Sequence, residues 1–205
     1  MHTDLINANH PDALNRALAV LQSGGLVAFP TDTVYGIGAL AFNNKAVEKI
    51  YIAKGRTTEK AIPILLGDLD DLAKVAAHIN PAVQKLAAHF WPGPLTLVVP
   101  RHSSIPENLS PLPTVGVRIP NHPVARSLLQ QAGPMAVSSA NRSGQTSPVN
   151  AKEVFAQLGG CIPLILDGGQ TPGGIPSTVV NCLGTEIIIL RHGPISFDDI
   201  RKILA

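Results

Sequence analysis

Short apolar runs that end in small polar residues recur along this chain and alternate with segments that have the apolar spacing of helices. The polar clusters that follow three of these runs are Thr31-Asp32-Thr33, Ser138-Ser139 and Asp167-Gly168-Gly169. Interleaved strands and helices predict an α/β fold with a mixed, largely parallel sheet and helices packed on it. Ligands bind beyond the carboxyl ends of strands in such sheets. We therefore expect the three clusters to line one crevice.

The first cluster belongs to the stretch Phe-Pro-Thr-Asp-Thr-Val-Tyr-Gly-Ile-Gly at residues 29–38, which predicts a buried strand ending in a polar loop. Residues 44–53 then carry apolar side chains at the spacing of one helix face. Lys54 and Arg56 follow this helix, where both cations can turn back toward the loop. Hydroxyls, exposed backbone and two positive charges suit a ligand that carries phosphate and carboxylate.

The other segments are read from apolar spacing and from capping residues. Helices are expected from residue 11 to the glycines at 24–25, at 68–77 with Asp68 as the cap, from 80 to about 91, and at 122–131. Two more are expected, one from the end of the loop at 142–150 to residue 158 and a short one after the cap Ser196. Strands are expected at 61–66, 95–99, 115–119, 135–137, 162–166, 178–182 and 186–191, with a turn at 183–185. Residues 142–150 are a candidate lid.

Composition limits the classes of function. Lys and Arg number 16 against 14 Asp and Glu, giving a formal net charge of +2, and no basic run is present. A protein coated with nucleic acid is not indicated, although a local basic cleft is allowed. The two cysteines have no metal-binding spacing, and neither a signal peptide nor a membrane span is visible. We expect one catalytic domain over residues 1–205 in a cytoplasmic protein.

Familiar catalytic and nucleotide-binding motifs give little support. Residues 36–41 fit GxGxxA only loosely, and the chain has no GxxxxGK[ST], GxSxG or HExxH. Arg118 faces away from the apolar residues of its strand, toward a polar site or toward a carboxylate at a sheet edge. Cations at a helix end, such as Lys54, also offset the helix dipole. Cations and hydroxyls without an obvious base or nucleophile favour phosphoryl or nucleotidyl transfer.

Seven ordered motifs resemble those of the YrdC-type L-threonylcarbamoyladenylate synthases. They are residues 29–38, Lys-Gly-Arg at 54–56, Trp-Pro-Gly-Pro-Leu-Thr at 91–96, Val-Arg-Ile-Pro at 117–120, Ser-Ser-Ala-Asn at 138–141, Pro-Ser-Thr-Val-Val at 176–180 and Leu-Arg-His-Gly-Pro at 190–194. The resemblance implies a twisted, open α/β sheet of the YrdC type with a concave basic cleft. It runs from about residue 10 to the end, and the length is that of the short form.

The resemblance also implies a reaction: L-threonine, bicarbonate and ATP give L-threonylcarbamoyladenylate and pyrophosphate. A separate tRNA-modifying transferase complex would use the product to modify the adenosine next to the anticodon. Mg²⁺ would accompany ATP, with no metal-binding side chain and no organic cofactor. Weak contact with tRNA is left open, and contact with a membrane is not expected.

The resemblance assigns roles to particular residues. The catalytic tetrad falls on Lys54, Arg56, Ser139 and Asn141. L-Threonine would contact Thr33, Arg118, Ser177 and main chain near Val137. ATP would contact Arg56, Lys60, Thr114, Ser139, Ser147 and Arg191. The chain departs from many members at Asp32 (glutamate in many), Leu65 (histidine in some) and Lys60 (asparagine in some).

Two other functions remain open at this stage. One is a binding module for double-stranded RNA or tRNA, against which the modest charge and 4% aromatic content argue. The other is an enzyme that carbamoylates adenylate from carbamoyl phosphate, as larger hydrogenase-maturation proteins do. This chain lacks the acylphosphatase and zinc-finger-like segments expected there.

Overall fold

The structure, a computed structural model, describes residues 1–184 and 186–205. Its strands are β1 (Asp4–Asn7), β2 (Val27–Phe29), β3 (Gly36–Leu40), β4 (Ile64–Leu65), β5 (Leu95–Pro100), β6 (Thr114–Arg118), β7 (Met135–Ser139), β8 (Leu164–Asp167), β9 (Thr178–Asn181) and β10 (Ile188–Arg191). Its helices are α1 (Ala13–Gln22), α2 (Asn44–Lys54), α3 (Leu72–Val75), α4 (Pro81–Phe90), α5 (Pro123–Ala132), α6 (Ala151–Leu158) and α7 (Phe197–Leu204). Thr185, in the turn expected before the last strand, lies outside the described residues.

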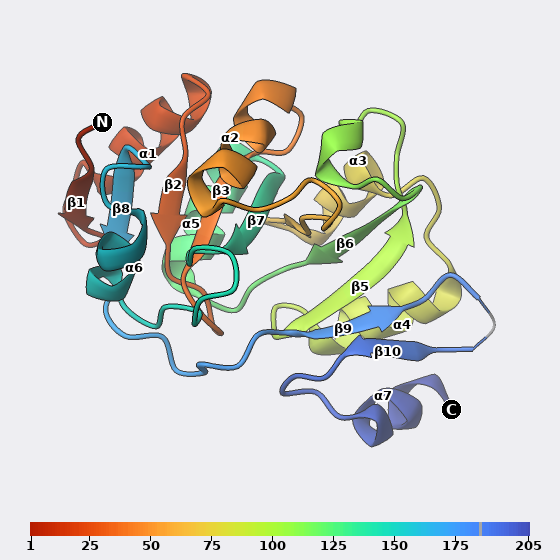
Figure 1. The fold of residues 1–205 in the computed structure, drawn as a ribbon. Coiled ribbons are helices and arrows are strands. Elements are labelled where there is room, and N and C mark those ends of the chain that lie inside the picture. The colour runs from red at the N-terminus through yellow and green to blue at the C-terminus, as the bar shows by residue number, and fades with distance from the viewer. Residues whose placement is uncertain (185) are drawn as a thin grey trace.

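These strands form one mixed sheet in the order β1-β8-β2-β3-β7-β4-β6-β5-β9-β10, as expected for the fold class (Figure 1). The expectation that it is largely parallel is wrong. Five neighbouring pairs are antiparallel and four are parallel. The consecutive strands β2 and β3, like β9 and β10, are joined without a crossover helix, and such short connections make antiparallel neighbours.

Strand β3 was not predicted, because its glycines indicated a loop. It lies inside the sheet between β2 and β7. A Cβ atom on Gly36 would be 2.7 Å from Cγ1 of Val137, and one on Gly38 would be 2.8 Å from Cε of Met135. The glycines are therefore needed because side chains of β7 fill the space above them. The short edge strand β1 was also missed.

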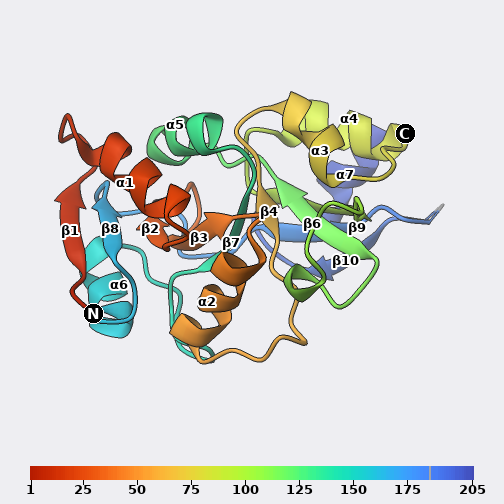
Figure 2. The same cartoon turned by 90° about the horizontal axis from the view of Figure 1, so that it is seen from above.

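Helices cover both faces of the sheet. Figure 2 shows α1 and α5 on one side of β1, β8, β2, β3 and β7, with α2 and α6 on the other. The α1 and α5 side buries one apolar cluster, which includes Leu21 and Leu128. The larger cluster extends from α2 and α6 to α4 and α7, and it includes Ile50 and Ile200. The apolar faces read from the sequence are thus the faces that pack.

The segment 68–77 differs from the single helix that was expected. A 3₁₀ turn, Leu69–Asp71, precedes the one-turn helix α3. Asp68 makes no side-chain cap; instead its carboxylate accepts hydrogen bonds from Arg126 and Gln130 on α5. Ser196 caps α7 as predicted, and Asn80, where a helix was expected to begin, caps α4. Among the described residues, no helix is both long enough and apolar enough to span a membrane.

Candidate active site

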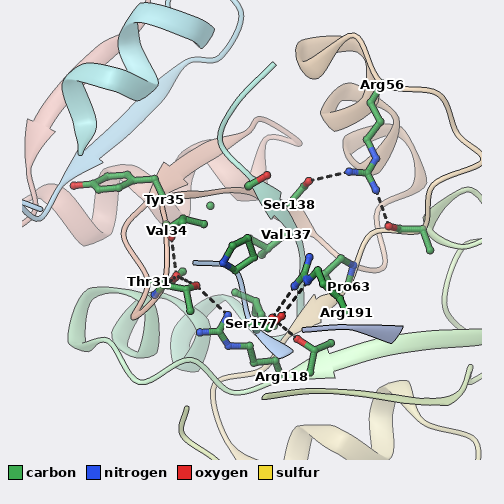
Figure 3. A pocket seen from close by; sticks show the side chains of 17 residues that line it. Thr31, Val34, Tyr35, Arg56, Pro63, Arg118, Val137, Ser138, Ser177 and Arg191 are labelled. Carbon is green, nitrogen blue, oxygen red and sulfur yellow. Dashed lines mark hydrogen bonds between the residues drawn. The ribbon is translucent and has the colours of Figure 1, made fainter. Parts of the chain in front are cut away.

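One pocket collects residues from much of the chain (Figure 3). Its cavity of about 180 Å³ lies among the 31–36 segment, Arg56, Thr96, the ends of β6 and β7, residues 176–177 and Arg191. Seven residues that the sequence assigned to the site line it: Thr33, Arg56, Arg118, Val137, Ser139, Ser177 and Arg191. Strand ends from both halves of the sheet therefore meet here.

Arg118 is the most deeply buried cation of the pocket, with 5% of its surface exposed. Its Nε donates to the Gly93 carbonyl (2.9 Å), its Nη1 donates to Oγ1 of Thr33 (3.2 Å), and its Nη2 forms an ion pair with Asp32. Burial lowers the pKa of the guanidinium, and the Asp32 charge opposes this change. The sequence left a polar site and a carboxylate pair as alternatives for Arg118, and the structure contains both.

A second group of hydrogen bonds joins β5, β10 and the residue before β9. The hydroxyls of Thr96 and Ser177 lie 2.8 Å apart. Arg191 donates from Nη2 to Oγ of Ser177 (3.0 Å) and from Nε to its carbonyl (2.9 Å). Burial lowers the pKa of Arg191. The position of Arg191 therefore depends on Ser177.

Arg56 lies across the pocket from these groups. Its Nη2 donates to the carbonyls of Lys60 (3.1 Å) and Ala61 (2.9 Å), and its Nη1 donates to Oγ of Ser138 (3.4 Å). Burial lowers the pKa of Arg56. The two carbonyls hold the guanidinium at the rim and leave a positive charge facing the cavity.

Lys54 and Asn141 lie behind Ser139 and do not line the cavity. The Lys54 ammonium, 2% exposed, donates to the carbonyls of Ser139 and Asn141 (2.6 Å to the latter). Burial lowers its pKa to about 7, and the nearby Arg56 charge adds to this effect. Asn141 donates to the carbonyls of Arg142 and Gln145, both at 2.8 Å. Both side chains hold the loop that presents Ser139.

Three residues expected at ATP lie outside the cavity lining. Lys60 and Ser147 are in loops, and Thr114 is at the opposite end of β6 from Arg118, about 13 Å away along the strand. The third polar cluster, residues 167–169, also does not line the cavity, contrary to expectation. It lies behind Tyr35, whose hydroxyl donates to the Gly169 carbonyl (2.7 Å).

Sequence reasoning gave no role to Thr96 or Tyr35, which line the cavity. Ser138, expected at the crevice as part of a polar cluster, lines the cavity, and Asp32 of the first cluster pairs with Arg118 from behind it. Thr96 lay in a quoted motif, but its bond to Ser177 joins residues 81 positions apart. Leu65, at a position noted as a departure, lines the cavity with an apolar side chain.

The charge around the pocket favours an anionic ligand. Arg56, Arg118 and Arg191 all line it, and the carboxylate of Asp32 pairs with Arg118. Nowhere in the described part of the chain do three or more His, Cys, Asp or Glu side chains form a group that could hold a metal ion.

Comparison with known proteins fits this geometry. The sequence model of the Sua5/YciO/YrdC family, described as "Telomere recombination", matches residues 19–193. The chain belongs to the Sua5/YciO/YrdC family. The threonylcarbamoyl-AMP synthase of Bacillus subtilis (strain 168) is 40% identical over 208 residues, which cover 98% of this chain and 59% of the relative. A protein of Mycobacterium tuberculosis (strain ATCC 25618 / H37Rv), named putative threonylcarbamoyl-AMP synthase, is 38% identical over 207 residues, which cover 98% of this chain and 95% of the relative.

Solved structures of the Sua5/YciO/YrdC family agree with the fold. Sua5 of Pyrococcus abyssi complexed with L-threonine superposes with a TM-score of 0.95 at 38% identity, covering 98% of this chain and 61% of that one. The chain thus spans about 60% of the length of several family members that it matches. The shared region contains every residue that lines the pocket.

Proposed function

We propose that this Sua5/YciO/YrdC protein makes L-threonylcarbamoyladenylate and pyrophosphate from L-threonine, bicarbonate and ATP. One observation carries the proposal: three arginines, of which Arg118 is buried, and a set of hydroxyls from distant segments meet in a single small pocket. Similarity to a structure complexed with L-threonine supports the choice of amino acid. The product would pass to a separate tRNA-modifying transferase complex in the cytoplasm.

L-Threonine is proposed to occupy the cavity itself. A volume of about 180 Å³ is below the roughly 300–1,000 Å³ of pockets for drug-sized ligands, so it suits an amino acid better than a nucleotide. Arg118 keeps guanidinium N–H groups beyond those bonded to Asp32, Thr33 and Gly93, and these can bind a carboxylate. Thr33, Ser177 and main chain near Val137 complete the contacts with threonine.

ATP is proposed to lie across the open rim. Arg56, Ser139 and Arg191 border both the cavity and the rim, and Lys60, Thr114 and Ser147 would contact the nucleotide outside it. Guanidinium groups bind phosphate oxygens through paired, charge-assisted hydrogen bonds. Mg²⁺ is treated as part of the substrate MgATP, because the described residues offer no cluster of metal-binding side chains.

The chemistry has two steps. The neutral amine of threonine attacks bicarbonate and releases water, which leaves a carbamate on nitrogen. A carbamate oxygen then attacks the α-phosphorus of ATP in line, and the bond to pyrophosphate breaks. Arg56 and Arg191 stabilise the charge that develops on the phosphate oxygens. Lys54 and Asn141 act from behind by holding the carbonyls around Ser139.

Mass spectrometry of protein, MgATP, bicarbonate and L-threonine tests the proposal. The adenylate is expected only in the complete mixture, and omission of any one component abolishes it. Carbamoyl phosphate in place of bicarbonate should give no product; product from carbamoyl phosphate alone would contradict the assignment. Lys54→Ala is expected to lower pyrophosphate release about 10²–10³-fold, since the loop that presents Ser139 loses its buried donor. Near-normal turnover would remove Lys54 from the mechanism.

A further inference from the structure

Residues 168–177, here called the crossing segment, connect the two halves of the sheet. β8 and β9 stand near opposite ends of the strand order, so the chain between them must pass the pocket. Figure 1 shows this connection running from β8 on the left to β9 on the right. The segment ends at Ser177, which lines the cavity and holds Arg191. Its path therefore sets where two pocket residues lie.

The crossing segment is held against the first motif of the chain. The Tyr35 hydroxyl donates to the Gly169 carbonyl (2.7 Å) and accepts from the Gly168 N–H (3.2 Å). Further along, the Gly174 N–H donates to the Thr33 carbonyl (3.1 Å). The two segments, about 135 residues apart in the sequence, are thus joined by hydrogen bonds. In each bond a main-chain group of the crossing segment is satisfied by a side-chain or main-chain group of the first motif.

The contact between the two segments is close. A Cβ atom on Gly168 would lie 2.7 Å from Cγ of Pro30, and one on Gly173 would lie 3.1 Å from the Thr33 carbonyl oxygen. Glycine at both positions allows the crossing segment to lie directly on the motif. A small displacement of the segment would therefore be transmitted along it rather than absorbed by a gap.

Tyr35 is itself held firmly. Its side chain is fully buried, its N–H donates to the Pro148 carbonyl (2.9 Å), and its carbonyl accepts from the Ala140 N–H (2.8 Å). In Figure 3 its ring points away from the centre of the pocket. Burial raises the pKa of its hydroxyl to about 12, so the group keeps its proton and remains a donor near neutral pH.

We infer that Tyr35 is a positioning residue for the threonine site, where its hydroxyl holds the start of the crossing segment and thereby sets the position of Ser177. The inference rests on the proposed function, in which Ser177 contacts L-threonine. Tyr35 does not touch the reacting atoms. It acts through the main chain of Gly168 and Gly169, and its effect should appear in substrate affinity more than in turnover.

Tyr35→Phe tests this role, because it keeps the ring and removes the hydroxyl. Thr3→Val is the matched control. The buried Thr3 hydroxyl also donates to one carbonyl, that of Ile162, and accepts from one amide, Gly160 N–H (2.8 Å), but Thr3 directly precedes β1 and does not line the pocket. The measurements are steady-state pyrophosphate release and, in ligand-free protein, amide hydrogen exchange over residues 168–177.

Tyr35→Phe is expected to raise KM for L-threonine about tenfold with kcat changed less than about threefold, and to speed exchange in the crossing segment. Thr3→Val should leave KM and the exchange rate of the crossing segment unchanged. It should lower the melting temperature by about as much as Tyr35→Phe does. The inference would be overturned if a folded Tyr35→Phe protein had the same KM for L-threonine as wild type, or the same rate of amide exchange at residues 168–177. If the wild-type chain shows no threonine-dependent activity, the proposed function fails, and the exchange comparison alone decides the role of Tyr35.

Discussion

The Arg118–Asp32 pair concentrates two opposite charges where little water reaches them. Removing one partner of such a pair leaves the other charge buried and unpaired, which typically costs about 3–5 kcal/mol. We therefore expect Arg118→Met to lower the free energy of unfolding by about 3–5 kcal/mol as well as to abolish threonine binding. Urea denaturation monitored by circular dichroism measures the first effect.

A double variant separates charge from packing. Asp32→Asn removes the carboxylate that Arg118→Met leaves behind, so the double variant is expected to recover part of the lost stability without recovering activity. If it were no more stable than Arg118→Met alone, the unpaired Asp32 charge would not be the cause of the loss.

Lys54 predicts a distinct dependence of stability on pH. Its pKa in the folded chain is about 7, below the ordinary value of 10.5. Between these values the unfolded chain binds a proton that the folded chain has released, so the free energy of unfolding rises with pH in this window. A tenfold difference in proton affinity corresponds to about 1.4 kcal/mol. Below pH 7 both states are protonated and this gain is absent.

The comparison that isolates Lys54 uses Lys54→Met, which is apolar and similar in length. Urea denaturation at pH 7, 8 and 9 should show wild type gaining stability relative to the variant as pH increases. Other titrating groups are common to both proteins and cancel in the difference. A difference that stays constant with pH would mean that the ammonium titrates near its ordinary value.

At the residue level, strand periodicity predicted that Arg118 faces a polar site, and the helix end predicted that Lys54 and Arg56 turn back toward the first motif. The partners of these groups could not be predicted. Asp32 with Arg118, Thr96 with Ser177, and Lys54 with the Ser139 carbonyl join positions about 80 to 90 apart. Such pairs follow from the order of strands in the sheet, which local sequence patterns do not encode.

At the level of elements, apolar spacing and caps were sufficient for the long helices. They failed where tertiary contacts override local preference, as in β3, where glycines are required by the side chains of β7. The short, half-exposed β1 has too few residues to show alternation. The relative direction of neighbouring strands was also not predictable from local patterns. A short turn without a helix places the next strand antiparallel, and such turns made the sheet more antiparallel than expected.

The link between β10 and α7 is an element that should affect the pocket. A Cβ atom on Gly193 would lie 2.4 Å from the Thr178 nitrogen and 2.6 Å from the Pro176 oxygen, both main-chain atoms. Gly193→Ala must therefore displace the backbone on either side of Ser177. We expect KM for L-threonine to rise at least fivefold, measured by pyrophosphate release, with a loss of about 1–3 kcal/mol in stability.

Ser196→Ala is the matched control for this change. It removes the capping box at the start of α7, three residues further along, and should cost about 1 kcal/mol without changing KM. If both variants lowered stability and left KM unaltered, the β10–α7 link would support the fold and not the pocket.

For the whole molecule, we propose that residues 1–205 form one catalytic domain that unfolds cooperatively. The larger apolar cluster includes Ala28 of β2, Ile50 of α2, Leu97 of β5 and Ile200 of α7, so it joins both halves of the sheet. Calorimetry is expected to give one transition whose calorimetric and van't Hoff enthalpies agree. Two separable transitions would indicate that the halves fold independently.

The pocket draws its lining from Thr31 to Arg191. No short segment of this chain can hold a complete binding site, and removal of residues 191–205 would take away Arg191, one of the three arginines that line the pocket. Two inactive fragments, produced by a cut at the exposed residues 111–113, should regain activity only after they reassociate. Activity is consequently a test of folding for almost the whole polypeptide, because a protein that turns over substrate must have residues 31–191 correctly folded.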